Sequence, residues 1–128
     1  MTSPISRDVL VGTWRLEAFD VDDGQGRRPW RPPASGLLLY GADGMMSVAI
    51  NGSLADTHPT AAVLFYAGRF TLAEDERGPF VTHHVEQSTD PLRMGKSLRR
   101  DVRLEGELLH LHGERPDGLR SWLRWRRI

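Results

Sequence analysis

The stretch LVGTWRL, residues 10–16, decides the fold of this chain, together with WRRI, residues 125–128, at its other end. The first stretch ends a short segment, about residues 6–11, that is predicted to be helical because Ser6 suits the N-cap and Gly12 stops a helix. From Thr13 onward, apolar and polar residues alternate with the period of a β-strand, and the same alternation returns before residue 128. We therefore expect both ends to be strands that pair as the two edges of one closed antiparallel barrel.

Between these ends, pattern and turn residues predict a total of eight strands. They lie at about residues 13–21, 36–40, 45–50, 65–72, 80–88, 97–104, 107–112 and 119–127. Short and long connections alternate, and in an up-and-down barrel every second connection lies at the same end. One end is therefore expected to be tight and the other to carry the long loops. The longest loop, residues 22–35, holds Trp30 among three prolines and is predicted to cover the open end.

Composition limits the classes of function. The 128 residues suit one domain, 1–128, that buries a core without crosslinks, and the absence of cysteine excludes thiolate chemistry. Seventeen basic residues balance seventeen acidic ones, so neither nucleic acid nor a membrane is an expected partner. The polar N-terminus has no apolar signal core, and no apolar run is long enough to span a membrane. The expected location is the cytoplasm.

Several stretches follow one another along most of the chain: LVGTWRL at 10–16, LLY at 38–40, DGMMS at 43–47, YAGRF at 66–70, VTHHVE at 81–86, Arg100, and LRW at 123–125. Together they resemble the small lipocalin-like domain family of bacteria and fungi. Gly12-Thr13-Trp14 is similar to the Gly-x-Trp signature of lipocalins, and Arg127 matches the late arginine that stacks on its tryptophan. The resemblance implies an all-β fold, an eight-stranded antiparallel up-and-down lipocalin-like barrel of the calycin type with a short N-terminal helix. It implies less about activity, since some lipocalin-like barrels are cyclases of natural-product pathways.

Strand alternation predicts which side chains point into the barrel. The candidate ligand-binding residues on the inner face are Tyr40, Met46, Phe70, Leu98, Leu111 and Leu123, beside Leu38 and Val48. Trp30 is expected near the mouth. Trp14 and Arg127 are expected to close the tight end through a cation–π contact, as structural residues.

The strand at 80–88 has two faces, and either could be buried. One face carries Phe80, Thr82, His84 and Glu86, and the other carries Val81, His83, Val85 and Gln87. Hydropathy slightly favours burying the valines. The register suggested by connection lengths instead places Glu86 beside Tyr66 on the neighbouring strand. It also places His84 beside Arg100, and we therefore predict the polar face inside.

The polar side chains predicted inside the barrel are candidates for proton transfer and for binding an anionic group. Tyr66, His84 and Glu86 are candidate catalytic residues because they could move a proton near neutral pH. Arg100 is a candidate ligand-binding residue because its fork of donors holds a carboxylate or enolate, although burial would require Glu86 or a backbone carbonyl as its acceptor. The alternative is a satisfied structural network of the same residues.

Three functions stay open on these grounds. The first is uptake of a small, mostly apolar molecule that bears a carbonyl or carboxylate group, in the barrel cavity. The second is a cofactor-free cyclase or isomerase of a natural-product, polyketide-like pathway, which folds its substrate and uses acid–base catalysis. The third is a filled barrel with a structural or interaction role.

Metal and cofactor sites are not expected. His83 and His84 are neighbours on a strand and point to opposite faces, so they cannot share an ion. An outward row of His83, Asp101 and His110 is more typical of cross-strand polar contacts than of a metal site. The chain contains no nucleophile elbow, phosphate loop or dinucleotide fingerprint, so no cofactor is predicted.

A patch of outward apolar side chains is expected on the hairpin of residues 36–50. It consists of Leu37, Leu39 and Met45. Such a patch favours either a homodimer surface or cover from the N-terminal helix.

Overall fold

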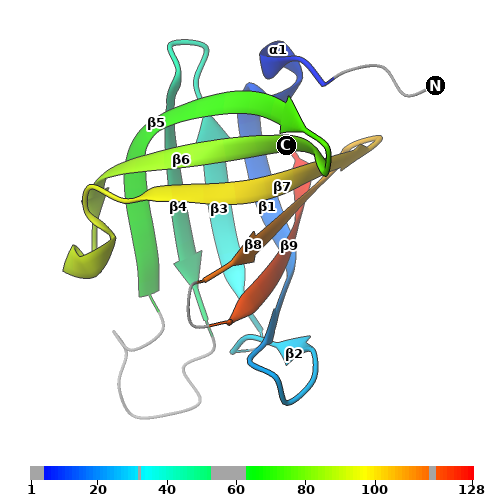
Figure 1. Ribbon diagram of the computed structural model, residues 1–128, viewed down its shortest axis with the longest axis vertical. Coiled ribbons are helices and arrows are strands. Elements are labelled where there is room, and N and C mark those ends of the chain that lie inside the picture. Colours follow the sequence, from blue (N-terminus) through cyan, green and yellow to red (C-terminus); the bar gives the residue numbers. More distant parts are fainter. Residues whose placement is uncertain (1–4, 32, 53–62, 116–117) are drawn as a thin grey trace.

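The computed structural model describes residues 5–31, 33–52, 63–115 and 118–128. Eight long antiparallel strands close into a barrel, since each strand pairs with the next and the first pairs with the last (Figure 1). The strands are β1 (Gly12–Asp22), β3 (Ser35–Tyr40), β4 (Met45–Asn51), β5 (Val63–Asp75), β6 (Gly78–Ser88), β7 (Ser97–Glu105), β8 (Leu108–Glu114) and β9 (Arg120–Arg127). The predicted barrel is confirmed.

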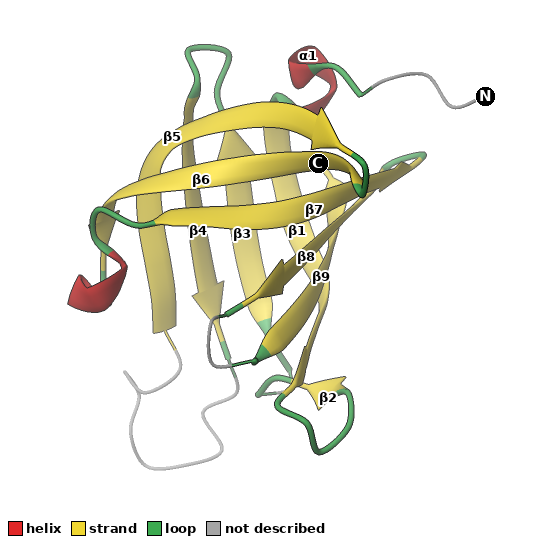
Figure 2. Ribbon diagram, in the orientation of Figure 1, coloured by secondary structure: helices red, strands yellow, loops and turns green. Residues whose placement is uncertain are grey.

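In the described part of the chain, three short elements accompany the barrel (Figure 2). Helix α1 (Arg7–Leu10) precedes the barrel, β2 (Arg28–Pro29) pairs with the C-terminal end of β1, and the 3-10 helix η1 (Pro91–Arg93) follows β6. The predicted helix is therefore present, although the Ser6 side chain makes no capping hydrogen bond.

The two ends of the barrel differ as predicted. The turns after β3, β5 and β7 lie at one end with α1, whereas β2, η1, the end of β4 and the start of β5 lie at the other (Figure 1). Gly44 and Gly106 occupy two of the tight turns with φ of 88° and 60°, values that glycine adopts without strain. We call these the tight end and the open end.

Trp14 and Arg127 close the tight end. Trp14 is fully buried, and its indole Nε1 donates a hydrogen bond to the Leu10 carbonyl at 3.0 Å. The Arg127 guanidinium lies 4.2 Å from the ring centroid and donates to the carbonyls of Val9 and Val11. The predicted cation–π contact is therefore present, and it also fastens α1 to the barrel.

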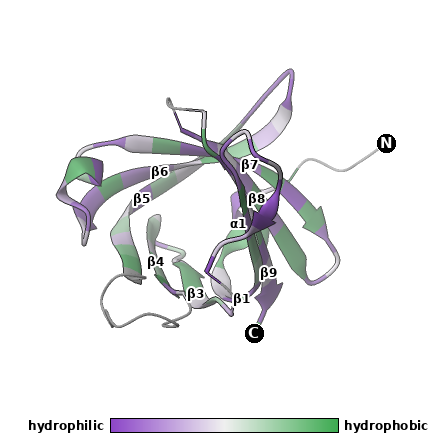
Figure 3. Ribbon diagram, turned by 90° about the horizontal axis from the view of Figure 1, so that it is seen from below, coloured by the Kyte–Doolittle hydropathy of each residue, from purple (hydrophilic) through white to green (hydrophobic). Residues whose placement is uncertain are grey.

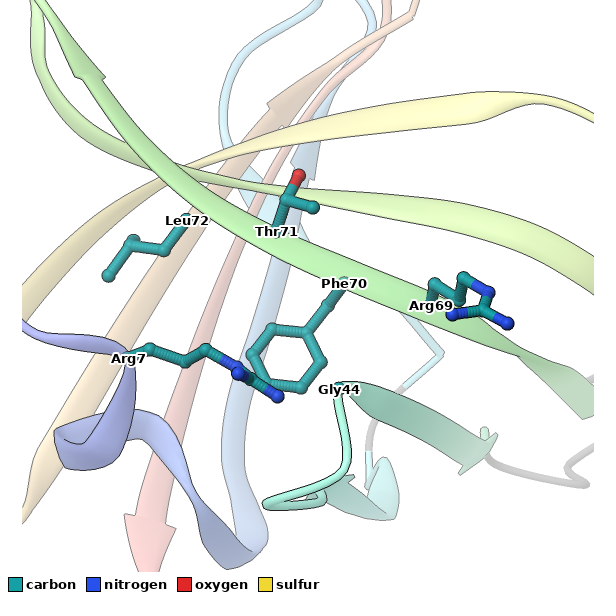
Figure 4. A pocket seen from close by; sticks show the side chains of 6 residues that line it. All are labelled: Arg7, Gly44, Arg69, Phe70, Thr71 and Leu72. Carbon is teal, nitrogen blue, oxygen red and sulfur yellow. The ribbon is translucent and has the colours of Figure 1, made fainter.

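A small hollow at the tight end lies between α1 and β5 (Figure 4). Its volume is about 390 Å³, and Arg7 extends across it toward the ring of Phe70, 5.4 Å from the ring centroid. Arg7 also donates to the Ala42 carbonyl at 3.0 Å, which ties the helix to the β3–β4 turn. We interpret this contact as cover for the base of the barrel.

The inner face of β6 differs from the prediction. Val81, His83 and Val85 are buried, while His84 points outward and Glu86 is exposed. The reason is the register: a two-residue turn pairs Asp75 with Gly78, which places His83 opposite the buried Phe70. Residues that lie directly opposite each other share a face, and a shift of one residue exchanges the faces of a whole strand. The predicted inward position of His84 and Glu86 is therefore wrong.

A β-bulge at Glu86 accompanies this register. Ala67 pairs with Gln87 and Gly68 pairs with Val85, so Glu86 has no partner on β5. Gly68 permits the close approach of the two strands, because a Cβ at this position would lie 1.8 Å from the His84 carbonyl oxygen. Gly68 therefore allows the backbones of β5 and β6 to pack closely against each other.

Candidate functional site

A cavity of about 1150 Å³ occupies the barrel and reaches its open end. Figure 3 views the ring of strands from that end, with hydrophobic segments along the strands. Half of the residues that line it are apolar: Phe19, Val21, Trp30, Leu38, Val48, Ile50, Leu64, Leu92, Leu98, Leu111, Leu119, Leu123 and Trp125. An apolar cavity with a few polar groups is typical of small-molecule sites.

The structure places the predicted ligand-binding residues in two groups. Those that line the cavity are Trp30, Leu98, Arg100, Leu111 and Leu123. Tyr40, Met46 and Phe70 are buried in the core, with the rings of Tyr40 and Phe70 4.6 Å apart at their centroids. They are absent from the cavity lining because side chains fill the part of the barrel toward the tight end, as in other small barrels.

Trp30 is held against the wall of the cavity. Its ring stacks on Phe19 with centroids 4.9 Å apart, and its backbone N–H donates to the Phe19 carbonyl at 2.8 Å. Phe19 faces inward because β1 also contains an irregularity, at Glu17, between the pairs Leu16–Trp125 and Ala18–Arg124. Alternation alone missed Phe19, since this irregularity reverses the alternation along β1.

A buried polar trio forms part of the deep wall. The two ring nitrogens of His83 contact two hydroxyl groups, with Nε2 2.6 Å from Tyr40 and Nδ1 2.7 Å from Tyr66. His83 is 1% exposed, and burial, aided by the charges of Arg100 and His84, lowers its pKa from 6.5 to about 3. Burial raises the pKa of both tyrosines. The trio is therefore neutral at pH 7.

Arg100 lies beside this trio as a half-buried residue of the cavity lining. Its Nη1 donates to the backbone carbonyl of Arg99 at 2.9 Å. The side chain fits against β8 because Gly113 has no Cβ, which would otherwise lie 2.7 Å from Nη1. The predicted acceptor for Arg100 is thus a backbone carbonyl.

The candidate catalytic residues are not brought together. Tyr66 lines the cavity, but His84 contacts Thr71 and Ser97 on the outer face, at 3.3 and 3.0 Å. Glu86 is exposed and lies 3.9 Å from Arg69. Because neither side chain lines the cavity, neither can reach a ligand there.

The remaining surface features are placed as follows. His83 is inside, so the outward row of His83, Asp101 and His110 does not form, and His110 instead contacts Glu105 at 2.8 Å.

Leu37, Leu39 and Met45 are 40%, 43% and 38% exposed, as predicted for the hairpin patch. Within the described ranges, no helix is long and apolar enough to cross a membrane.

Fold and cavity together define a lipocalin-like β-barrel. The chain belongs to the lipocalin-like domain family, whose sequence profile matches residues 53–128. It is 32% identical over 114 residues to a 4'-hydroxy-3'-methoxypropiophenone carrier protein of Aspergillus oryzae, a match that covers 81% of this chain and 94% of that protein. Its fold is similar to that of a redesigned β-barrel, with a TM-score of 0.57 and 15% identity over 100% of this chain and 99% of the other.

Proposed function

We propose that this protein is a carrier that takes up a small, mostly apolar molecule bearing a carbonyl or carboxylate group. The observation that carries the proposal is the open cavity of about 1150 Å³, whose wall combines apolar side chains with polar and charged ones. The relative from Aspergillus oryzae supports it, because that protein is named as the carrier of an aromatic ketone.

The walls of the cavity suit a flat, ring-containing molecule. Phe19 and Trp30 present stacked aromatic rings on one wall, and Leu98 and Leu123 present half-buried aliphatic side chains. An aromatic ligand would bury its faces against such groups, while its oxygen atoms would require hydrogen-bond donors such as Arg100.

The two rival functions have less support. An acid–base cyclase or isomerase would need at least two of Tyr66, His84 and Glu86 in the cavity, and Tyr66 is the one that lines it. A filled barrel would leave no open volume of this size. The carrier therefore remains the function that the geometry favours.

Binding of 4'-hydroxy-3'-methoxypropiophenone, measured by isothermal titration calorimetry, tests the proposal. We expect wild-type protein to bind it and Leu98→Trp, which narrows the cavity, to weaken binding about tenfold or more. Leu37→Trp is the matched control because Leu37 lies on the outer face and is 40% exposed. Leu123→Trp is a second cavity variant for the case in which Leu98→Trp does not fold.

Two results would contradict the proposal. The first is the absence of heat at millimolar ketone and of any binding to its carboxylate counterpart, 4-hydroxy-3-methoxybenzoate. The second is full affinity in both cavity variants with folding intact, which would place the ligand elsewhere. Thermal melts of each variant establish that folding is intact.

A further inference from the structure

Charge is unevenly distributed around the cavity. Cationic side chains on its lining are Arg93, Lys96, Arg99, Arg100 and Arg115. Among the residues that the structure describes, the carboxylates of the same lining are Asp90 and Glu114. The whole chain has as many acidic as basic residues, so this wall is more basic than the protein as a whole. Low-dielectric walls of one charge sign attract ligands of the opposite sign.

Arg100 is the central cation of this wall. Its Nη1 donates to a neutral backbone carbonyl, and among the described residues no carboxylate forms an ion pair with it. Arg99, its neighbour along β7, differs because it is paired with both Asp75 and Asp101, at 2.7 and 3.1 Å. Arg100 therefore retains donors and charge for a group that enters the cavity.

Arg93 brings a second cation to the same region. It belongs to η1, its side chain is 25% exposed, and its Nε lies 3.6 Å from Asp90. Burial lowers the pKa of Arg93, and the charges of Arg100 and Arg115 act in the same direction. These guanidinium groups thus repel one another across a partly buried space, and an anion between them would relieve the repulsion.

The buried trio directs a proton of Tyr66 toward this space. Neutral His83 has one N–H and one acceptor nitrogen, so it donates to one tyrosine and accepts from the other. In the described part of the chain, the Tyr40 hydroxyl has no hydrogen-bond partner besides His83, so its hydrogen is satisfied only if Tyr40 donates to Nε2. His83 then donates from Nδ1 to Tyr66, whose own hydrogen is left for an acceptor on the cavity side.

We propose that the cavity binds its ligand as an anion, with a negatively charged oxygen held by Arg93, Arg100 and the hydroxyl group of Tyr66. This inference rests on the proposed function and narrows its ligand to small aromatic acids, phenolates or enolates. A neutral molecule of the same shape binds more weakly because the guanidinium groups would lose water without gaining a charged partner.

Two dyes that differ by one charged group test the inference. They are 8-anilinonaphthalene-1-sulfonate, an anion, and N-phenyl-1-naphthylamine, which has the same rings without the sulfonate. Fluorescence titration of wild-type protein at low salt should give an affinity for the anion at least about tenfold higher. Arg100→Met and Arg93→Met should each weaken the anion about fivefold or more and leave the neutral dye within about twofold. Tyr66→Phe should act in the same direction.

Arg103→Met is the matched control. Arg103 lies on β7, is exposed, and pairs with Glu105 at 3.2 Å on the outside of the barrel. The control should leave both dyes unchanged, while Leu98→Trp should weaken both if they occupy the cavity. Arg93→Met supplies the result if Arg100→Met fails to fold, because Arg93 lies outside the barrel strands.

The two proposals fail in different ways. Equal binding of both dyes by wild-type protein, or a preference for the anion that survives in the two arginine variants, would overturn the anion site alone. The absence of binding by either dye would count against the cavity as a binding site, and hence against the proposed function as well.

Discussion

Burial of His83 between two tyrosines makes the stability of this protein depend on pH. The pKa of His83 falls from 6.5 to about 3 on folding, so the unfolded chain binds a proton between these values and the folded chain does not. The contribution of neutral His83 to the free energy of unfolding is complete above pH 6.5 and is lost as pH falls toward about 3. At about 1.36 kcal/mol for each pH unit, the full window corresponds to about 5 kcal/mol, and a fall to pH 5 to about 2 kcal/mol.

Urea unfolding of wild-type protein and His83→Gln at pH 7 and pH 5 measures this effect. The variant is expected to be less stable at pH 7. Between pH 7 and pH 5, its free energy of unfolding should fall by about 2 kcal/mol less than that of wild-type protein. This interval avoids most titration of the ion-paired carboxylates Asp75 and Glu105, whose pKa values are lowered by their arginine and histidine partners. His84→Gln, on the outer face, should keep the wild-type dependence. Parallel pH profiles for wild type and His83→Gln would refute the reasoning.

Three further substitutions test the tight end of the barrel, the bulge at Glu86 and the loop that carries Trp30. Trp14→Ala should lower the free energy of unfolding by about 3–5 kcal/mol, because it removes a fully buried indole that contacts Arg127; a loss under about 1 kcal/mol in urea titrations would contradict this. Gly68→Ala should lower the melting temperature sharply, because its Cβ would meet the His84 carbonyl, and an unchanged melting temperature would show that β6 can move away. Trp30→Phe should remove the largest part of any ligand-induced fluorescence quenching, with Trp122→Phe as the control; equal quenching in Trp30→Phe would exclude Trp30 from the site.

Much of the fold could be predicted because alternation and turn residues agree along most strands. Leu98, Arg100, Leu111 and Leu123 were all placed on the inner face correctly, since β7, β8 and β9 run without a change of register. The match of Trp14 with Arg127 was also predictable, because it requires only that the first and last strands pair.

The error on β6 has a definite physical origin. Its inner face depends on the length of one turn, and the observed two-residue turn between Asp75 and Gly78 differs by one residue from the predicted register. Hydropathy, which favoured Val81 and Val85, was the better guide. The register suggested by connection lengths predicted His83 on the outer face. Its burial is stabilised by hydrogen bonds at both ring nitrogens, which no pattern along a single strand can reveal.

Arg93 was missed for a different reason. It lies in η1, a single turn that has no periodicity of its own, and it reaches the cavity through the path of the chain after β6. Asp90 before Pro91 was an available signal for that turn, because its side chain accepts a hydrogen bond from the Leu92 N–H. That signal predicts the turn, but it cannot tell where the turn packs.

The unpaired Glu86 divides β6 into two segments of opposite phase. Val85 before it and Ser88 after it both lie opposite inward positions of β5, although they are three positions apart in the sequence. Deleting Glu86 would therefore remove the bulge and leave the pairs on both sides of it in place. Val85, Gln87 and Ser88 would then form a regular strand, still opposite Gly68, Ala67 and Tyr66, so the segment that carries Arg93 would keep its side of the barrel. A deletion elsewhere in the strand, with the bulge kept, would instead exchange the faces of the residues beyond it. Among relatives, a length change of one residue at Glu86 is therefore compatible with the same cavity wall.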